Sequence, residues 1–325
     1  MKKVLVTGAA GFIGMHLARS LLLDGVDVTG FDNVNDYYDV SLKQARLGIL
    51  LDEPRFTFVR GDLADRGTVR RLIAEGGFET VVNLAAQAGV RYSLTNPEAY
   101  IESNLTGFFN IIDACKEFAA PHFVYASSSS VYGSNTKLPF SEEDRAESPV
   151  SLYAATKKAN ELMAHSYSHL HGLATTGFRF FTVYGPYGRP DMALFIFVKN
   201  ILEGEPVKVF NHGDMQRDFT YIDDIIRGIR ALMERSASLS DAALPYRIYN
   251  IGNSKPVQLM EFVRAIENEL GKKAEIEFLP LQPGDVKSTF ADVSKLQNDA
   301  GYTPKTLLAD GVREFVRWYR EFYGM

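Results

Sequence analysis

The first 180 residues alternate between short apolar runs and longer amphipathic stretches. The apolar runs are rich in β-branched and aromatic residues, which is typical of strands buried on both faces. Strands are predicted at Val4–Thr7, Val26–Phe31, Phe56–Arg60, Thr80–Leu84, Phe123–Ser127 and Thr175–Phe180. Helices are predicted between them, at Ile13–Leu23, Thr68–Ala74, Tyr100–Phe118 and Tyr153–His169. This alternation predicts an α/β fold with a doubly wound parallel sheet.

The pattern changes after about residue 180, where turn signals such as Tyr184–Pro190 and Asn211–Asp214 become frequent. Further helices, separated by short strand-like pieces, are predicted at Leu194–Leu202, Ile222–Met233, Leu259–Leu270 and Leu307–Phe322. We expect one domain over residues 1–180, to which segments near 221–253 return, and a smaller α/β lobe over residues 181–325. The lobe should cover the carboxyl ends of the strands, where open sheets bind ligands.

A glycine-rich turn, Gly8-Ala9-Ala10-Gly11-Phe12-Ile13-Gly14, joins the first predicted strand to the first predicted helix. Gly8 permits a tight turn, Gly11 lets backbone approach a pyrophosphate, and Gly14 lets the helix pack closely on the strand. The helix N-terminus favours anions through its N–H groups and macrodipole. The spacing differs by one residue from G-x-G-x-x-G, so the turn alone is also compatible with a purely structural role.

Residues at the ends of the following strands extend this pattern. Asp32 closes the second strand, where a carboxylate accepts hydrogen bonds from ribose hydroxyls and repels a 2′-phosphate, which favours NAD over NADP. Asp62, after the third strand, suits an adenine amino group, although an ordinary loop carboxylate is the alternative. Leu84, Ala85 and Ala86 follow the fourth strand and would let a cofactor lie against the backbone. Together these residues predict that residues 1–180 form a dinucleotide-binding domain that holds NAD.

A tyrosine and a lysine, Tyr153 and Lys157, lie four residues apart on one predicted helix, so both point from the same face. A free tyrosine has a pKa of about 10 and is a poor base near neutrality. An adjacent ammonium and a positive nicotinamide ring both favour the phenolate, which can then take a proton from a hydroxyl. Such pairs are more often an aromatic edge and a solvated lysine, and their place behind a dinucleotide turn favours the catalytic interpretation.

The run Ser127-Ser128-Ser129-Ser130 caps the fifth predicted strand. Its hydroxyls are expected to face the ligand cleft, where one of them can hydrogen-bond a reacting substrate oxygen and pass a proton to the tyrosine. A polar turn is the alternative interpretation, and the four adjacent positions leave the identity of the reacting serine open.

Taken together, these residues resemble the extended short-chain dehydrogenase/reductases, and among them the NAD-dependent nucleotide-sugar epimerases. The resemblance covers nearly the whole chain and rests on Thr7–Gly14, Asp32–Asn35, Asn83–Ala86, Ser127–Gly133, Tyr153–Lys157, Tyr184–Pro186 and Arg217–Asp224. Within this family the chain is most similar to the UDP-glucuronate 4-epimerases. That similarity rests on Ala85–Arg91, on Gly188–Ala193 and on a serine run that contains no acid.

The resemblance implies roles for individual residues. Tyr153 would be the general base, Ser128 its hydroxyl partner with Ser129 adjacent, and Lys157 the anchor of the nicotinamide ribose. Further cofactor contacts are implied for Phe12, Ile13, Asn33, Leu63 and Asn104. The implied reaction converts UDP-glucuronate to UDP-galacturonate through a 4-keto intermediate.

Substrate contacts also follow from the resemblance. A planar guanidinium pairs with two oxygens of a phosphate or carboxylate at once. Arg217 is the candidate for the diphosphate, and Arg91 and Arg189 are candidates for the sugar carboxylate. The remaining implied contacts are Ser128, Ser129, Ser130 and Thr182 near the sugar, Val209 and Phe210 near the uracil, and Asp285 near a ribose. Each arginine taken alone is equally compatible with a solvated surface position.

Composition narrows the class of protein. The chain has 325 residues and a formal net charge of −5, which gives no reason to expect nucleic acid or an anionic membrane as a partner. Cys115 is the single cysteine, which fits a reducing compartment, and no apolar run approaches the length of a membrane span. We expect a cytoplasmic protein that needs no metal. Tyr100–Phe118 and Tyr153–His169 are compatible with the homodimer interface of the family, or with core helices.

Four alternatives remain at this stage. A 4,6-dehydratase needs acids after the catalytic hydroxyl, where this chain has Ser129 and Ser130. A UDP-glucuronate decarboxylase shares the substrate and the oxidation, and differs in releasing a pentose. A neutral UDP-hexose 4-epimerase would not depend on Arg189. A non-catalytic NAD-binding sensor or scaffold commonly loses the tyrosine or the lysine, and both are present here.

Overall fold

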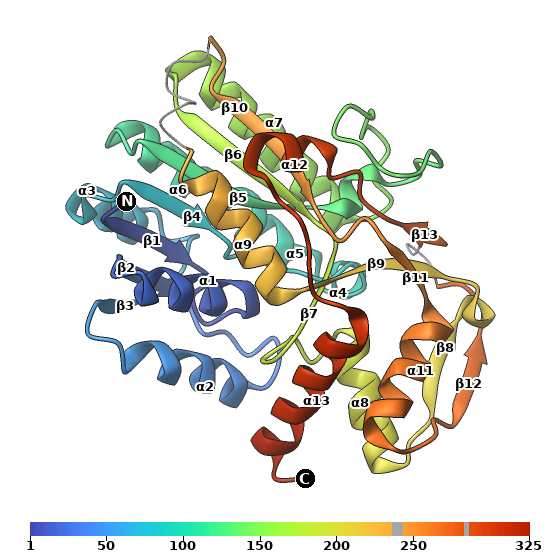
Figure 1. The fold of residues 1–325 in the computed structure, drawn as a ribbon. Helices are drawn as coiled ribbons and strands as arrows, with labels where there is room; N and C mark the ends of the chain where they lie inside the picture. The colour runs from blue at the N-terminus through green and yellow to red at the C-terminus, as the bar shows by residue number, and fades with distance from the viewer. Residues whose placement is uncertain (236–242, 283–285) are drawn as a thin grey trace.

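A seven-stranded parallel sheet forms the centre of the protein in the computed structural model, which describes residues 1–235, 243–282 and 286–325 (Figure 1). The strand order is β10-β6-β5-β4-β1-β2-β3. The strands are β1 (Lys3–Thr7), β2 (Asp27–Asp32), β3 (Phe56–Arg60), β4 (Thr80–Asn83), β5 (His122–Ser128), β6 (Ala174–Phe180) and β10 (Tyr246–Ile251). Chain order reverses beside β1, and the carboxyl ends of the strands at such a reversal form the usual ligand crevice.

Helices cover both faces of the sheet, and the alternation of side chains along each strand assigns residues to the two layers. Val4 packs in the cluster that contains the apolar residues of α1 (Phe12–Leu23), and Leu5 packs in the cluster that contains those of α6 (Gly107–Glu117). On the α1 side lie α2 (Val40–Leu51) and α9 (Ile222–Met233), and on the α6 side lie α3 (Arg66–Gly76) and α7 (Leu152–His171).

The predicted fold class is confirmed, and the six predicted strands agree with β1 to β6 to within about two residues at each end. The sequence analysis did not predict the twelve-residue helix α2, because Lys43 and Arg46 occupy buried positions on it and interrupt its apolar stripe. The predicted helix Tyr100–Phe118 is also divided, since a π-helical segment, η1 (Ile101–Thr106), precedes α6. Late in the chain, β10 pairs in parallel with β6 at the edge of the large sheet.

The second part of the chain forms smaller sheets beside the carboxyl ends of the large one (Figure 1). One contains β7 (Thr182–Tyr184), β9 (Gln216–Tyr221), β11 (Pro256–Gln258) and β13 (Ser288–Thr289), and the other pairs β8 (Val207–Phe210) with β12 (Ile276–Leu279). The accompanying helices are α8 (Ala193–Glu203), α11 (Leu259–Leu270), α12 (Ser294–Ala300) and α13 (Leu308–Tyr323). Short helical segments complete the chain: α4 (Tyr92–Thr95), α5 (Pro97–Tyr100), η2 (Ser129–Tyr132) and η3 (Asn211–Gly213).

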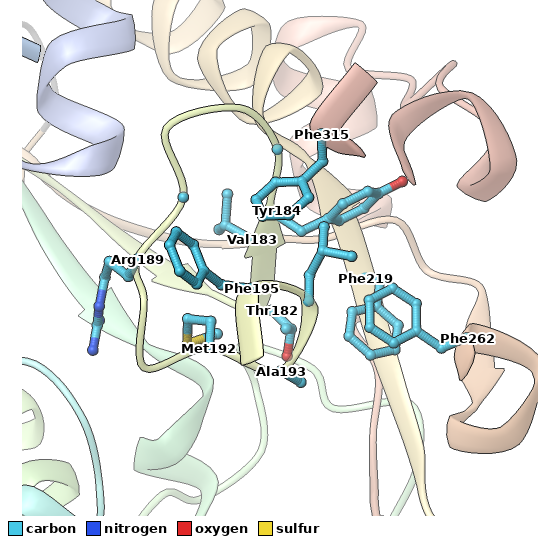
Figure 2. Close-up of a pocket in the computed structure, with 13 residues that line it drawn as sticks. Thr182, Val183, Tyr184, Arg189, Met192, Ala193, Phe195, Phe219, Phe262 and Phe315 are labelled. Atoms are coloured by element: carbon cyan, nitrogen blue, oxygen red, sulfur yellow. The ribbon is translucent and has the colours of Figure 1, made fainter. Parts of the chain in front are cut away.

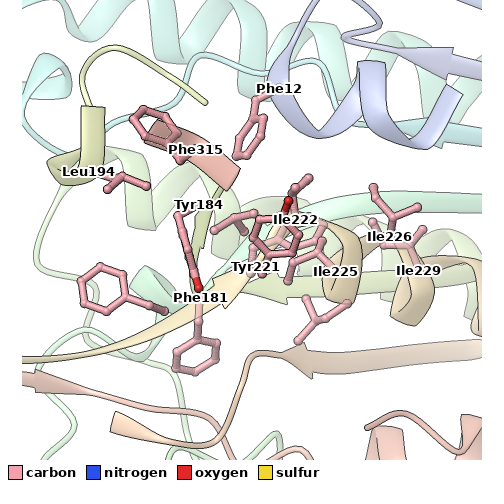
Figure 3. Close-up of a cluster of buried hydrophobic side chains, with 14 of the residues drawn as sticks. Phe12, Phe181, Tyr184, Leu194, Tyr221, Ile222, Ile225, Ile226, Ile229 and Phe315 are labelled. Carbon is pink, nitrogen blue, oxygen red and sulfur yellow. The ribbon is translucent and has the colours of Figure 1, made fainter. Parts of the chain in front are cut away.

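A continuous apolar cluster joins the two parts of the chain (Figure 3). Phe12 from α1 and Phe315 from α13 lie at one end of this cluster, and the isoleucines on the buried face of α9 extend it along the large sheet. Tyr184, at the end of β7, lies between them. The segment that follows β7 therefore starts from a fixed position. Within the described ranges, no helix combines the length and apolar character needed to cross a bilayer.

Candidate active site

The glycine turn between β1 and α1 is closely packed. Gly8 has φ +71° and its carbonyl accepts a hydrogen bond from the Gly11 amide at 2.8 Å. A Cβ on Gly14 would lie 2.0 Å from Gly8 O, and a Cβ on Gly8 would lie 2.8 Å from Ala85 N. Gly11, the N-cap of α1, has no side chain to cover the first amides of the twelve-residue helix. The turn therefore offers an anion the exposed helix N-terminus, as a dinucleotide pyrophosphate requires.

The loop after β4 forms one wall of this turn. Ala85 donates its amide to Thr7 Oγ1 at 3.1 Å, so the small residues predicted at Leu84, Ala85 and Ala86 lie directly against the glycine turn. Asn104, on η1, fixes the next residue of the loop, because its amide group accepts from Gln87 N at 2.8 Å and donates to Gln87 O at 3.0 Å. The structure thus gives Asn104 a role in shaping the loop, and a direct cofactor contact from it stays a prediction.

Acidic residues at the ends of β2 and β3 converge beside the turn. Asp32 accepts hydrogen bonds from Ala10 N at 3.0 Å and Val34 N at 2.8 Å, and burial raises the pKa of Asp32. Asn33 donates to Asp62 Oδ2 at 2.8 Å. A carboxylate fixed next to a glycine turn fits the adenosine ribose of NAD. The backbone carbonyl of Leu63 accepts a hydrogen bond from Asn110 at 2.8 Å, which fixes Leu63 against α6, and its cofactor contact stays a prediction.

The predicted catalytic residues meet above the end of β5. Ser151 caps α7 by accepting a hydrogen bond from Ala154 N at 3.1 Å, which starts the helix just before Tyr153. Burial raises the pKa of Tyr153, whereas a hydrogen bond with Ser128 and the positive charge of Arg189 lower it. The structure therefore brings Tyr153, Ser128 and Arg189 together, although they come from three separate segments.

Lys157 lies one turn further along α7 and is buried. Its Nζ donates to Ala126 O at 2.9 Å, and burial lowers the pKa of Lys157 to about 8. Burial raises the pKa of Tyr153, and the residues that lower it are Ser128 and Arg189. An effect of the Lys157 ammonium on the tyrosine stays a prediction for the protein with its cofactor.

The four serines have different surroundings. Ser127 donates to Glu161 Oε1 at 2.7 Å, and Glu161 is held by Arg179 in a buried ion pair at 2.8 Å. Ser128 is the last residue of β5, and its hydroxyl donates to Ser130 Oγ at 3.1 Å and accepts from Ser130 N at 3.2 Å. Ser129 and Ser130 lie on η2. Among the four serines, Ser128 is the one that lowers the pKa of Tyr153, which favours it as the hydroxyl partner.

Arg189 lies in the segment between β7 and α8 and, like Thr182, is one of the residues that line an aromatic pocket (Figure 2). In this view its guanidinium extends away from the aromatic side chains Phe219 and Phe262. Arg189 pairs with Asp191, which also accepts a hydrogen bond from the Tyr37 hydroxyl at 3.0 Å. Arg189 lowers the pKa of Asp191, whereas burial raises it, and the net shift is downward. The sequence analysis missed Tyr37 and Asp191, although Asp191 belongs to the motif that it singled out.

The remaining predicted residues belong mainly to the second part of the chain. The Arg91 guanidinium lies 5.1 Å from the centroid of the Phe210 ring, so two predicted substrate residues from different parts of the chain are in contact. Val209 is buried in β8. Arg217, on β9, donates to Gln216 O at 2.9 Å and to Lys287 O at 3.2 Å. The predicted ribose contact, Asp285, lies outside the described residues.

Comparisons with known proteins identify the family of the chain. Residues 4–252 match the NAD dependent epimerase/dehydratase family. The chain is 46% identical to the probable UDP-glucuronate 4-epimerase of Rhizobium meliloti (strain 1021), covering 99% of this chain and 98% of that one. It is 48% identical to UDP-glucuronate 4-epimerase 4 of Arabidopsis thaliana, and the match covers 98% of this chain and 76% of that protein. Among solved structures, the chain is similar to UDP-glucuronic acid 4-epimerase from Bacillus cereus in complex with UDP-glucuronic acid and NAD. The TM-score is 0.92 at 34% identity, and the match covers 99% of this chain and 100% of that one.

Proposed function

The chain belongs to the NAD dependent epimerase/dehydratase family, and from this premise we propose that it interconverts UDP-glucuronate and UDP-galacturonate by inverting C4 of the sugar. The relatives named above carry this activity in their names and align along almost the whole chain. NAD is the cofactor, in agreement with the family and with the ligands of the Bacillus cereus structure.

The observation that carries the proposal is the position of Arg189 next to the tyrosine–serine pair. The charge of Arg189 lowers the pKa of Tyr153, and Tyr153 in turn raises the pKa of Arg189. A uronate differs from a neutral hexose by one carboxylate on the carbon next to C4. A guanidinium near the reacting position pairs with that carboxylate, whereas a neutral sugar would leave the charge without a ligand partner.

The residues around the glycine turn would hold NAD. The amides at the start of α1, Gly11 to Ile13, suit the pyrophosphate, Asp32 suits the adenosine ribose, and Lys157 suits the nicotinamide ribose. Asn33 and Asp62, which are joined by a hydrogen bond beside the turn, are the residues proposed for the adenine. When bound, NAD supplies reversible oxidation of the sugar at C4.

Tyr153 takes the proton of the 4-hydroxyl while the carbon is oxidised, and it returns a proton when the carbon is reduced on the other face. Ser128 supplies the hydroxyl through which that proton passes, since it is the serine that acts on Tyr153 and lowers its pKa. Burial disfavours the phenolate in the protein alone. Positive charge at the site, from Arg189 and from the bound cofactor, must therefore favour the phenolate for Tyr153 to act as a base.

Arg189 and Thr182 have a second task. The 4-ketone is β to the sugar carboxylate, and β-keto acids readily lose carbon dioxide. An epimerase has to hold the carboxylate in a plane that disfavours this loss, because C–C cleavage requires overlap with the ketone. Arg189 is tied to Asp191 and so supplies a fixed charge for the clamp, and the hydroxyl is assigned to Thr182 from the resemblance to the family.

The test is incubation of the purified protein with UDP-glucuronate and identification of the products by NMR. We expect a mixture of the two UDP-hexuronates with no net consumption of NAD. A UDP-pentose would identify a decarboxylase instead. Conversion of UDP-glucose at an equal rate would show that the carboxylate is not recognised.

Three coarser properties complete the proposal. We place the dinucleotide-binding domain at residues 1–180 with β10 and α9 added, and the substrate lobe in the rest of residues 181–325.

A homodimer is supported by exposed apolar side chains on two neighbouring helices, Phe109 on α6 and Leu162 on α7. Leu162→Glu should shift the protein to a monomer in sedimentation velocity. We place the site of action in the cytoplasm. UDP-sugars occur there, and the single free cysteine is compatible with its reducing conditions.

A further inference from the structure

Arg46, on α2, is a fully buried arginine. Its Nε and Nη2 donate to Tyr187 O at 3.1 and 2.7 Å, and Nη2 also donates to Gly188 O at 3.2 Å. Its Nη1 donates to Ala10 O at 3.1 Å and to the Tyr38 hydroxyl at 2.5 Å. A guanidinium has five N–H donors, and these five hydrogen bonds use all of them.

The acceptors of Arg46 belong to the two halves of the active site. Ala10 lies in the glycine turn, and its own amide donates to Asp32 Oδ2 at 3.0 Å. Gly188 directly precedes Arg189 in the chain. One residue, Ala10, thus separates Arg46 from the carboxylate proposed for the NAD ribose, and one peptide group separates it from the arginine proposed for the sugar carboxylate.

A second side chain from the dinucleotide half holds the same segment. His16, on α1, lies with Nε2 3.0 Å from Pro186 O, and burial lowers the pKa of His16 to about 4. A neutral imidazole must carry its proton on Nε2 to bond a carbonyl. The backbone needs such support, because Tyr187 adopts a left-handed φ of +58°. The segment that carries Arg189 therefore rests on α1 and α2.

A buried charge is an expensive way to fill a core position, and an apolar residue of similar size is often as stabilising. An apolar residue cannot bond two backbone segments at once, as the planar guanidinium does here. We infer that Arg46 is a positioning residue that couples the NAD-binding turn to Arg189, so that NAD retention and recognition of the sugar carboxylate depend on each other. The carboxylate half of this inference rests on the proposed function.

Two variants test this coupling, Arg46→Gln and Arg46→Lys. Lysine keeps the charge but is a compact point donor with three N–H groups, so it should not replace the five bonds. Arg55→Gln is the matched control, because Arg55 pairs with Asp27 on the surface. Circular dichroism melting curves identify any variant that is not folded at the assay temperature, and His16→Gln then replaces it.

Binding is measured by calorimetry on the NAD-loaded proteins, with UDP-glucuronate and with UDP alone. UDP lacks the sugar carboxylate, so the Arg46 variants should bind it within about twofold of wild type while losing about tenfold in affinity for UDP-glucuronate. The NAD content after gel filtration should also fall. Equal losses for both ligands, or unchanged NAD content together with unchanged affinity for UDP-glucuronate, would overturn the inference.

A double-mutant cycle with Arg189→Gln asks whether Arg46 acts through Arg189. If it does, Arg46→Gln should add little to the loss of UDP-glucuronate affinity that Arg189→Gln causes by itself. Additive losses would contradict the coupling. A failure of the proposed function would appear in the wild-type chain as absent conversion of UDP-glucuronate, whereas NAD retention by the Arg46 variants is measured without any sugar.

Discussion

Asp191 holds one edge of the Arg189 guanidinium: Nε lies 3.0 Å from Asp191 Oδ1, and Nη2 lies 2.5 Å from Asp191 Oδ2. A guanidinium presents a second edge, formed by its two terminal nitrogens, that can pair with another carboxylate. Asp191 is in turn fixed by the Tyr37 hydroxyl. The ion pair thus orients Arg189 while leaving that second edge for the sugar carboxylate.

Asp191→Asn should weaken the orientation of Arg189 without changing the volume of the side chain. We expect kcat/KM for UDP-glucuronate to fall by about tenfold, equivalent to about 1.4 kcal/mol of transition-state binding, while affinity for UDP stays the same. Steady-state kinetics and calorimetry measure the two quantities. Tyr37→Phe should produce a smaller loss in the same direction, and an increase of kcat/KM in either variant would show that Asp191 competes with the substrate instead.

Ser127 and Ser128 are neighbours with different predicted effects. Ser128→Ala removes the hydroxyl next to Tyr153, so kcat should fall by about 10²-fold or more while NAD remains bound. Ser127→Ala removes a buried hydrogen bond to Glu161, so stability should fall by about 1 kcal/mol with kcat nearly unchanged. Activity assays and urea unfolding separate the two outcomes, and the reverse pattern would move the catalytic role to Ser127.

Tyr153→Phe should reduce turnover by about 10³-fold or more, because it removes the group that we propose takes the 4-hydroxyl proton. Phenylalanine keeps the ring of Tyr153 and its edge contact with Tyr100, so the fold and NAD binding should persist. Cofactor content and single-turnover product formation measure both effects. Turnover near the wild-type rate would remove Tyr153 from the mechanism.

Lys157 should make the stability of the cofactor-free protein depend on pH. Burial lowers its pKa from 10.5 to about 8, so below about pH 8 the folded state bears the cost of a buried charge. Between about pH 8 and 10.5 the folded state binds fewer protons than the unfolded state, and stability therefore rises with pH. The free energy of unfolding, measured relative to Lys157→Met, should rise by about 2–3 kcal/mol from pH 7 to pH 10. A constant difference would show that Lys157 is not desolvated.

Two glycine-to-alanine changes should have opposite effects. A Cβ at Gly14 would lie 2.0 Å from Gly8 O and 2.7 Å from Gly8 C, which are backbone atoms that cannot move without opening the turn. The Gly14→Ala variant should therefore fail to retain NAD, and its free energy of unfolding should fall by about 2 kcal/mol or more. Gly48 is an exposed position on α2 with open space around it, so Gly48→Ala should stabilise the protein by about 0.5–1 kcal/mol. Thermal unfolding and NAD content check both variants.

The amino-acid sequence by itself determined those features that depend on near neighbours in the chain. The buried strands followed from continuous apolar runs, the turn before α1 followed from three glycines, and the shared face of Tyr153 and Lys157 followed from helical periodicity. The family followed from the same local motifs, and the match over residues 4–252 agrees with it. α2 was missed because its inner face carries Lys43 and Arg46, which interrupt the apolar stripe that would have marked a buried helix.

The tertiary structure alone decided how distant residues meet. Tyr37 and Asp191 are 154 positions apart, and Arg46 and Tyr187 are 141 positions apart, so no periodicity relates them. Which serine faces Tyr153 was likewise decided by packing, because Ser127 turns to Glu161 and Ser128 does not. The physical reason is that hydrogen bonds and ion pairs depend on position and direction to within fractions of an ångström. Only the folded chain sets those positions for segments that the sequence keeps far apart.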